Sequence, residues 1–445
     1  MSEISIIIPS EFSLQPASSK SKLIDTSQGN FLIFLLPILG LVKIDLIGEL
    51  FTHEIILLLL FPVLLLKRSH LLSRSAAKSV LLIGLFWFIS QVTTDLYQQT
   101  PVEDLIRGWA KISFFLFSFA SLVMLLTTSR RILLWITAST ISMFVRPFLL
   151  FAGDLDPFVL WKFGVGSALL LFACLPSLEK IFKNIDDVEP LRRIAYLHIG
   201  FGIGSFFLNA RSFAGLTIFA GVLLLLYIRY CGIQIKSMAL AIGCALALAG
   251  SVLIINVYSY GAASGLFGDE AQSKYEIQNA YGSGTLAVLL GGRSESLVST
   301  QAIANSPIIG HGSWAKDFKY LIMYVDMRRA FSEDQGNPLD IDANDGLIPS
   351  HSYLLGAWVE AGLLGGLFWI SILVLCIFRV IPAAFGTHSP IGVFAIMSMP
   401  MFLWNVMFSP FGANVRVEAA GTLTIFIAVL TYAITQYDLK RELDR

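Results

Sequence analysis

A single histidine lies where the longest polar stretch of the chain meets an apolar run. Residues Ile348–Leu354 read IPSHSYL, and a long apolar helix is predicted to follow. Ser350 suits the N-cap position and would place His351 in the first helical turn, where a neutral imidazole is favoured and can act as a general base. The alternative is an interfacial histidine that bonds a loop carbonyl. Glu360 shares the helical face of Tyr353, opposite His351, so we do not expect it to orient His351.

Seven basic residues form the second candidate group, because they fall on the predicted outer side of a membrane. They are Lys43, Arg107, Lys111, Arg146, Lys162, Arg211 and Arg416. Arg146 and Lys162 lie inside apolar runs, where a cation costs at least about 2.5 kcal/mol and is often retained for a ligand or an ion path. Each residue by itself is explained as well by snorkelling or by pairing with a carboxylate. The candidate partners are Asp45, Glu49, Asp154 and Asp156. As a set, the seven favour an anionic outer-leaflet ligand such as a lipid-linked diphosphate, which suits paired guanidinium contacts.

The elements that must position these residues are predicted to be membrane helices. Of 445 residues, 56% are apolar and only 14% are charged, whereas soluble domains carry about 25% charged residues. The zero net charge gives no reason to expect a nucleic-acid partner. Apolar runs close to the roughly 20 residues that cross a bilayer predict an all-α polytopic membrane protein with twelve spans. These lie at 31–48, 51–66, 79–94, 110–128, 132–152, 158–177, 193–209, 212–229, 237–257, 351–378, 390–409 and 418–436.

The basic residues of the short connections predict the orientation. A cytoplasmic N-terminus places 18 of the 31 Lys and Arg residues inside. The predicted organisation is a cytoplasmic tail (1–30), nine spans (31–257), one large periplasmic loop (258–350), three spans (351–436) and a second cytoplasmic tail (437–445). The loop contains six basic and eleven acidic residues. We expect it to be folded, with short helices near 294–305 and 315–330, because structured loops of this length are commonly functional.

Other patterns have simpler explanations. The four cysteines lie in or beside apolar runs without a CxxC pair, so neither a disulfide nor a zinc site is expected. The histidines are scattered over both predicted faces, and no metal site is predicted, although the acidic residues near 340–345 could also bind a divalent ion. The Gly200/Gly204 and Gly362/Gly366 spacings predict close helix packing.

Three stretches of the chain carry a further set of motifs. The first is Gly291–Glu295, with an arginine before a predicted helix, followed by the Pro-x-x-Gly-x-Gly turn of Asn305–Gly312 (NSPIIGHG). The second is His351–Leu354 with Glu360–Gly365 behind it, and the third is Asn209–Ser212 between two spans. Together, in this order, they resemble the motifs of the O-antigen ligase and polymerase superfamily of bacterial surface polysaccharide assembly. The family often has an aromatic residue four positions after the loop arginine, where this chain has a leucine.

The resemblance implies a glycosyltransferase at the periplasmic face of an inner membrane, with a GT-C-like architecture. Its donor would be a glycan on undecaprenyl diphosphate, and its acceptor a sugar hydroxyl on lipid A–core or on a second lipid-linked glycan. Arg211 and Arg293 would bind the diphosphate and stabilise the leaving group, while His351 would take or orient the acceptor proton. No metal or other cofactor would be required. The expected substrate-contacting residues are Tyr353, Arg146, Lys162, Arg416 and His311.

Three alternatives stay open at this point. A polymerase of the same superfamily would use two lipid-linked chains, and a further enzyme could transfer the glycan to a protein. A flippase or another transporter also suits twelve spans, but such folds commonly place charge along a path through both leaflets and contain internal repeats. Here the intramembrane cations lie in the outer half, and no repeat is visible.

Overall fold

The structure is a computed structural model of the whole chain. It describes residues 27–46, 48–150, 160–208, 210–232, 260–266, 294–330 and 346–443, together with residues 272 and 275. The predicted ninth span (237–257), Arg293 and Asn209 lie outside the described residues, as does the side chain of Lys162. The placement of these residues stays a prediction.

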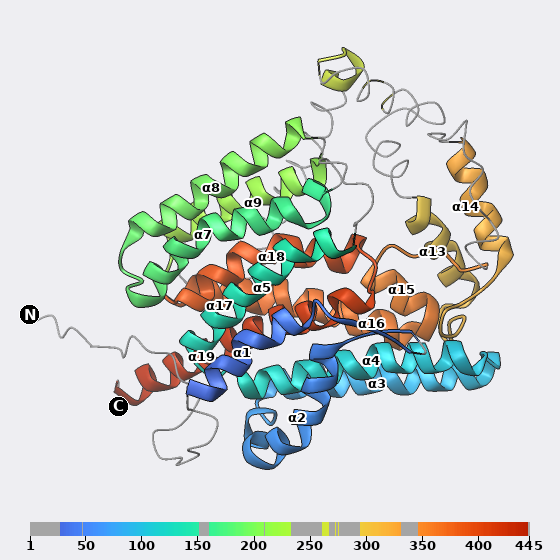
Figure 1. The fold of residues 1–445 in the computed structure, drawn as a ribbon, viewed down its shortest axis with the longest axis horizontal. Coiled ribbons are helices and arrows are strands. Elements are labelled where there is room, and N and C mark those ends of the chain that lie inside the picture. Colours follow the sequence, from blue (N-terminus) through green and yellow to red (C-terminus); the bar gives the residue numbers. More distant parts are fainter. Residues whose placement is uncertain are drawn as a thin grey trace, which may run out of the picture.

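Helices make up almost all of the described structure (Figure 1). The first half contains α1 (Ser27–Leu39), strands β1 (Lys43–Leu46) and β2 (Gly48–Phe51), α2 (Thr52–Arg68), α3 (Ser75–Gln98), α4 (Val102–Leu125), α5 (Ser129–Leu150), a π-helical turn (Trp161–Val165), α7 (Gly166–Lys183), α8 (Val188–Phe207) and α9 (Arg211–Tyr230). The second half contains α13 (Ser294–Asn305), α14 (Phe318–Ala330), α15 (Tyr353–Ala361), α16 (Leu363–Leu375), a second π-helical turn η3 (Cys376–Val380), α17 (Ile381–Gly386), α18 (Pro390–Phe408) and α19 (Arg416–Leu443). Short 3₁₀ turns lie at Ser69–Leu71 and Ala413–Val415.

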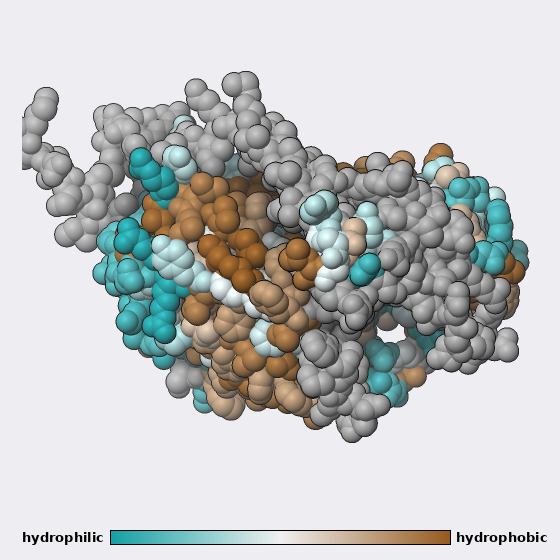
Figure 2. All heavy atoms as spheres, turned by 90° about the horizontal axis from the view of Figure 1, so that it is seen from above, coloured by the Kyte–Doolittle hydropathy of each residue, from teal (hydrophilic) through white to brown (hydrophobic). Residues whose placement is uncertain are grey.

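The chain is a multi-pass α-helical membrane protein by the length and apolar character of its helices. Among the described residues, seven helices are long and apolar enough to cross a bilayer. Apolar side chains are exposed on these helices and on two others: Leu85 of α3 and Val374 of α16 are 50% and 49% exposed, and Leu66 of α2 and Phe207 of α8 are 88% and 83% exposed. Figure 2 shows a broad hydrophobic area over the middle of one face, with hydrophilic residues gathered at its margin. A soluble protein rarely exposes a continuous apolar surface of this kind, whereas lipid covers it at no cost.

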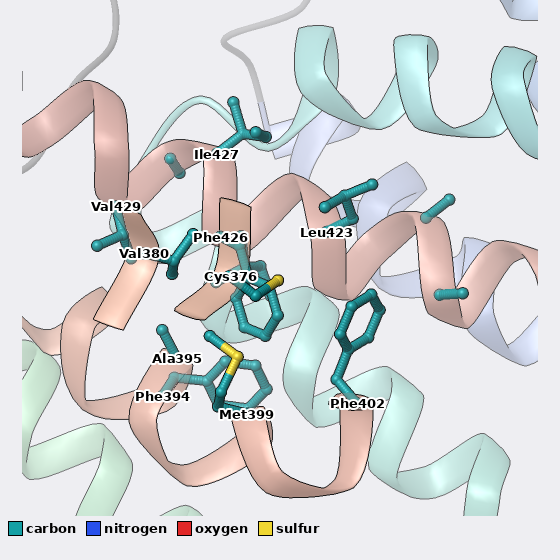
Figure 3. Close-up of a cluster of buried hydrophobic side chains, with 14 of the residues drawn as sticks. Cys376, Val380, Phe394, Ala395, Met399, Phe402, Leu423, Phe426, Ile427 and Val429 are labelled. Atoms are coloured by element: carbon teal, nitrogen blue, oxygen red, sulfur yellow. The ribbon is translucent and has the colours of Figure 1, made fainter. Parts of the chain in front are cut away.

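The core runs through most of the described helices, and one part of it lies where η3, α18 and α19 meet (Figure 3). Cys376 and Val380 of η3 lie beside Phe394 and Phe402 of α18, and Phe426 of α19 fills the space between them. The ring centroids of Phe402 and Phe426 are 5.2 Å apart in an edge-to-face arrangement, which is a favoured geometry for aromatic pairs. Around this core, α4 packs on α2, α3 and α19, and α9 packs on α8 and α18.

The first predicted span differs from the structure. The apolar run 31–48 is not one helix, because α1 ends at Leu39 and the antiparallel β1–β2 hairpin follows. The hairpin brings Asp45 directly opposite Glu49, and Lys43 lies 3.1 Å from a carboxylate oxygen of each. Continuing the helix would carry these charges into hydrocarbon, whereas the hairpin pairs them. The pairing alternative is therefore confirmed for Lys43.

The apolar run after His351 also differs from the prediction. It is divided at Gly362, whose φ of 71° ends α15 and allows α16 to begin in a new direction. The helix N-cap is Ser352 and not Ser350, since the Ser352 hydroxyl accepts a hydrogen bond from the Leu355 amide at 3.0 Å. His351 therefore precedes the helix and does not lie in its first turn. The short helices predicted near 294–305 and 315–330 are confirmed as α13 and α14.

The Gly200/Gly204 pair is used differently from the prediction. A Cβ atom on Gly200 or Gly204 would meet nothing within 4 Å, so these residues do not make the close contact of α8 with α9. That contact is made at Gly202 and Gly221, where a Cβ atom would lie 2.8 Å from the Ala214 carbonyl oxygen and 2.7 Å from the Ala195 carbonyl oxygen, respectively. Small residues do allow close helix approach here, but on a neighbouring helical face.

The helix connections gather at two opposite ends of the molecule. We call the His351 end the cluster of residues 99–101, 306–316, 350–352 and 409–415, and the Cys231 end the cluster of residues 184–187, 231–232 and 387–389. Helix α18 runs between them: Ser389 caps its start, and the carbonyl of Val406 near its end accepts a 3.1 Å hydrogen bond from Ser352.

Candidate functional site

His351 is exposed at the start of α15. The chain is fixed on both sides of it, at Pro349 and at Ser352. The Ser299 hydroxyl of α13 donates to the Pro349 carbonyl at 2.7 Å. The Ser352 hydroxyl caps α15 and donates to the end of α18. The backbone therefore holds the imidazole at a defined place on the surface, and the ring makes no hydrogen bond with any residue that the structure describes. Such a group is free to meet a substrate hydroxyl.

The segment Phe411–Glu418 brings three other predicted site residues together. The Tyr353 ring packs 4.8 Å from the ring of Phe411. Nη1 of Arg146 lies 3.0 Å from the Asn414 carbonyl and 2.7 Å from Glu418 Oε1. Arg416 belongs to the segment itself. Tyr353, Arg146 and Arg416 thus lie around one segment, and Tyr353 is two residues along the chain from His351. Tyr353 is only 2% exposed and serves first as a core aromatic residue.

Arg416 is held in a buried ion pair. Its Nε lies 2.7 Å from Glu54 Oε1, and its Nη2 donates to Glu54 Oε2 at 3.0 Å and to the Glu49 carbonyl at 3.1 Å. The two side chains are 4% and 0% exposed. Glu54 also accepts from the Phe51 amide at the start of α2. A buried charge is tolerated when it is paired and hydrogen-bonded in this way.

Ion pairing is general among the seven outer-side cations. Lys43, Arg107, Lys111, Arg146 and Arg416 each pair with a carboxylate. Apart from those of Lys43, the partners differ from the ones that the sequence suggested. The positive charge at the His351 end is therefore largely neutralised within the described residues. Arg211 is the first residue of α9, where a helix begins at the same end of the bundle.

The turn 306–316 docks on the break between α15 and α16. A helix that ends leaves carbonyl groups without helical partners, and the turn supplies donors for them. The His311 amide donates to the Val359 carbonyl at 2.7 Å, and the Gly312 amide donates to the Glu360 carbonyl at 3.0 Å. In return, the Leu363 amide donates to the Ile308 carbonyl at 3.0 Å. The Pro-x-x-Gly-x-Gly pattern thus forms a docked turn.

His311 lies at the far end of α15 from His351. Nine residues of helix separate the two positions, which corresponds to about 12 Å. The Nε2 atom of His311 lies 2.9 Å from the Ala302 carbonyl, so that the imidazole ties the turn to α13. Its geometry gives His311 an anchoring role, and its predicted contact with substrate stays a prediction.

A buried carboxylate that the sequence did not single out organises the same end. Asp95 Oδ1 accepts from the Ser313 amide at 2.6 Å and from the Thr100 hydroxyl at 3.0 Å. Its Oδ2 accepts from the Ser313 hydroxyl at 2.7 Å and from Trp109 Nε1 at 2.8 Å. Asp95 is 1% exposed. Four donors satisfy the charge and connect α3, α4 and the docked turn.

The ion pair between Lys111 and Glu360 was not predicted either. Lys111 Nζ forms an ion pair with Glu360 Oε2, and the ammonium group lies 5.1 Å from the centroid of the Trp314 ring. Lys111 was one of the seven outer-side cations, but its partner is 249 positions away. No spacing rule links residues so distant in sequence. The expectation that Glu360 does not orient His351 agrees with this pair.

No model of a known protein family and no curated protein matches the chain. Within the described residues, no group of three or more His, Cys, Asp or Glu side chains has the arrangement of a metal site. The candidate site is thus an exposed histidine on a fixed backbone, beside a buried set of paired cations and a docked turn. Such an arrangement can accept a proton and orient a polar ligand.

Proposed function

We propose that the chain is a membrane glycosyltransferase of the O-antigen ligase type. It would move a glycan from undecaprenyl diphosphate to a saccharide acceptor such as lipid A–core. In this proposal the chain crosses a bacterial inner membrane twelve times, both termini are cytoplasmic, and the His351 end faces the periplasm. The observation that carries the proposal is the exposed His351 on a fixed backbone. It precedes Tyr353 by two residues, and Tyr353 packs on the segment that also contacts Arg146 and contains Arg416.

His351 is assigned the acceptor side of the reaction. The acceptor hydroxyl must lose its proton as it attacks the anomeric carbon, and a neutral imidazole at hydrogen-bonding distance can take that proton. The exposed position at the membrane rim suits an acceptor that approaches from water while the donor lipid stays in the bilayer. The diphosphate leaves with the pair of electrons from the glycosidic bond.

Arg211 and Arg293 are assigned the diphosphate. Each guanidinium can contact two phosphate oxygens and stabilise the charge that grows on the leaving group. Arg146 and Arg416 are already paired with Glu418 and Glu54. In this proposal they shape the site next to the diphosphate. Arginines that neutralise the leaving group make a metal ion unnecessary in this mechanism.

A reconstituted transfer assay tests the proposal. The purified chain is mixed with undecaprenyl-diphosphate glycan and lipid A–core, and product size is read on a gel. We expect one discrete shift of lipid A–core. His351→Ala should lower the rate by about 10²–10⁴-fold through loss of the base, and Arg211→Lys should lose most activity because a point charge cannot reproduce paired contacts.

His70→Ala is the matched control, since His70 is an exposed histidine in the connection between α2 and α3. It should leave the rate unchanged. Full activity in His351→Ala would refute the assignment of the base. A ladder of longer lipid-linked glycans formed without lipid A–core would identify a polymerase instead. Movement of the lipid-linked glycan across vesicles without any transfer would identify a transporter and refute the proposed chemistry.

A further inference from the structure

Three polar side chains meet at the Cys231 end, remote from the proposed site. Cys231 follows the last residue of α9, His388 lies between α17 and α18, and Asp186 lies in the connection between α7 and α8. The Cys231 Sγ atom is 3.2 Å from His388 Nδ1, and His388 Nε2 is 3.1 Å from Asp186 Oδ1. The side chains form a chain of thiol, imidazole and carboxylate that the proposed glycosyl transfer does not use.

The order of the atoms sets the direction of proton movement. An ionised carboxylate only accepts hydrogen bonds, so Asp186 holds the ring proton on Nε2. The lone pair of Nδ1 then faces the Cys231 thiol and can accept its proton. The two ring nitrogens lie on different sides of the imidazole and engage different partners, which suits a proton relay and does not suit three ligands converging on one metal ion.

The surrounding backbone holds the thiol and the imidazole in place. The Gly232 amide donates to the Phe385 carbonyl at 2.8 Å, and the Tyr227 hydroxyl donates to the Thr387 carbonyl at 3.2 Å. These bonds join the end of α9 to the connection that carries His388. Two of the three connections, those that carry Cys231 and His388, are thus tied together, and Asp186 reaches them through its contact with His388.

The other described cysteines lack this environment. Cys174 and Cys376 are buried, whereas Cys231 is partly exposed. Cys174 also lies near a histidine, His198, but at 3.9 Å, and the His198 Nδ1 atom is engaged with the Ile194 carbonyl at 2.8 Å. The core pair therefore has neither solvent access nor a free base, and it serves as an internal comparison for Cys231.

We propose that Cys231, His388 and Asp186 form a nucleophilic thiol site that exchanges with small disulfides. His388 takes the thiol proton, and Asp186 stabilises the imidazolium that results. The Cys231 thiolate attacks one sulfur of the disulfide, a new S–S bond forms and the old one breaks. The leaving thiolate takes the proton back from His388. Excess free thiol reverses the reaction, so that no other oxidant or reductant is needed.

The electrostatics at the site agree with this assignment. The hydrogen bond from Cys231 and, after it, the charge of Asp186 raise the pKa of His388, while partial burial opposes the change. The titratable groups that face the imidazole are Cys231 at the end of α9 and Asp186 in the α7–α8 connection. Tyr227 lies near the thiol, and Tyr432 lies near Tyr227. A raised pKa favours the imidazolium form of His388, and an imidazolium stabilises a thiolate beside it.

Site-resolved thiol exchange tests the proposal. The purified full-length chain in detergent is treated with dithiodipyridine, and the mixed disulfide on the Cys231 peptide is followed by mass spectrometry over time. His388→Gln should slow this reaction by about tenfold near pH 7 and leave it unchanged above about pH 9, where any thiol is ionised. Asp186→Asn should give a smaller decrease. Asp187→Asn, which alters the adjacent carboxylate, should have no effect.

The pH profile separates activation from a folding defect, because a misfolded variant would not regain the wild-type rate in alkali. Equal rates for the wild type and His388→Gln at pH 7 would overturn the proposal. If His388→Gln does not fold, the wild-type profile decides: a rate that rises only with the titration of an ordinary thiol, near about pH 8.5, also overturns it.

Discussion

The two ends of the helical bundle use charged side chains in opposite ways. At the His351 end, Glu54 and Asp95 are almost completely buried, and each is satisfied by several donors. At the Cys231 end, His388 and Asp186 are 44% and 84% exposed, and each makes one charged contact. Buried groups of the first kind fix the relative positions of distant segments, because any displacement leaves a charge without a partner. Exposed groups of the second kind can exchange protons with solvent.

The difference suggests a division of labour. The proposed transfer from a lipid-embedded glycosyl donor would need a rigid frame in which the reacting groups are held in place, and the buried network of the His351 end would supply one. A thiol that reacts with small soluble molecules needs access more than rigidity. Charged contacts should therefore contribute more to stability at the His351 end than at the Cys231 end.

The largest effect is expected at the buried pair. Glu54→Gln leaves the Arg416 guanidinium in the interior without its counter-charge, which should destabilise the protein by about 3–5 kcal/mol. Glu49→Gln is the control, since the Glu49 side chain is 54% exposed and pairs with Lys43 at the surface. It should cost less than about 1 kcal/mol. Thermal unfolding in detergent measures both, and similar shifts would contradict the ranking.

The next effect is expected at the helix break. Gly362→Ala places a Cβ atom 2.0 Å from the Ile308 carbonyl oxygen at a φ of 71°, so that the docked turn must move. We expect a loss of about 2–4 kcal/mol from backbone strain and steric overlap, together with faster proteolysis in 306–316. Gly200→Ala, a substitution into open space within α8, should instead stabilise the protein by about 0.5–1 kcal/mol.

If Gly362→Ala unfolds at the temperature of the wild type, the docked turn is not tied to the helix break as the structure has it. If Gly200→Ala destabilises the protein as much as Gly362→Ala, then the surface of α8 at Gly200 is packed against another element. Either result would remove the contrast between the tight His351 end and the open face of α8.

Local patterns in the sequence predicted local structure. The segment SESLVSTQAIAN forms α13 over the predicted residues 294–305, and residues that favour chain breaks lie close to both of its ends, Gly291 and Gly292 before it and Pro307 after it. The run 390–409 likewise forms α18 over Pro390–Phe408. The prediction of one span over 31–48 was wrong, because a count of apolar residues cannot show that Lys43, Asp45 and Glu49 pair across a hairpin.

The candidate site was predictable only in part, for the same reason. His351 stands out because it lies at a polar–apolar boundary, and this boundary can be read locally. The contact of Asp95 with Ser313 spans 218 positions, and that of Arg416 with Glu54 spans 362. Nothing in the spacing of either pair distinguishes it from many other acidic and polar residues. The sequence therefore supplied the cations but, apart from Asp45 and Glu49 beside Lys43, not the carboxylates that neutralise them.

The smallest effect is expected at His388, and it depends on pH. The folded protein raises the pKa of His388 through its contacts with Cys231 and Asp186. A raised value means that protonated His388 stabilises the fold below the unfolded pKa of about 6.5 and that this contribution disappears as the pH rises through the folded value. The difference in melting temperature between the wild type and His388→Gln should therefore be larger at about pH 5 than at about pH 9.

The melting temperature of Glu54→Gln relative to the wild type provides the contrast, because the loss of a buried partner does not follow the protonation of a surface histidine. Its deficit should persist at both pH values, while that of His388→Gln should shrink on going to alkali. Asp186→Asn should weaken the pH dependence at the Cys231 end, since it removes one of the two contacts that raise the pKa of His388. A His388→Gln deficit that grows with pH would mean that the imidazole stabilises the fold in its neutral form, and the assignment of a thiolate–imidazolium pair would then have to be abandoned.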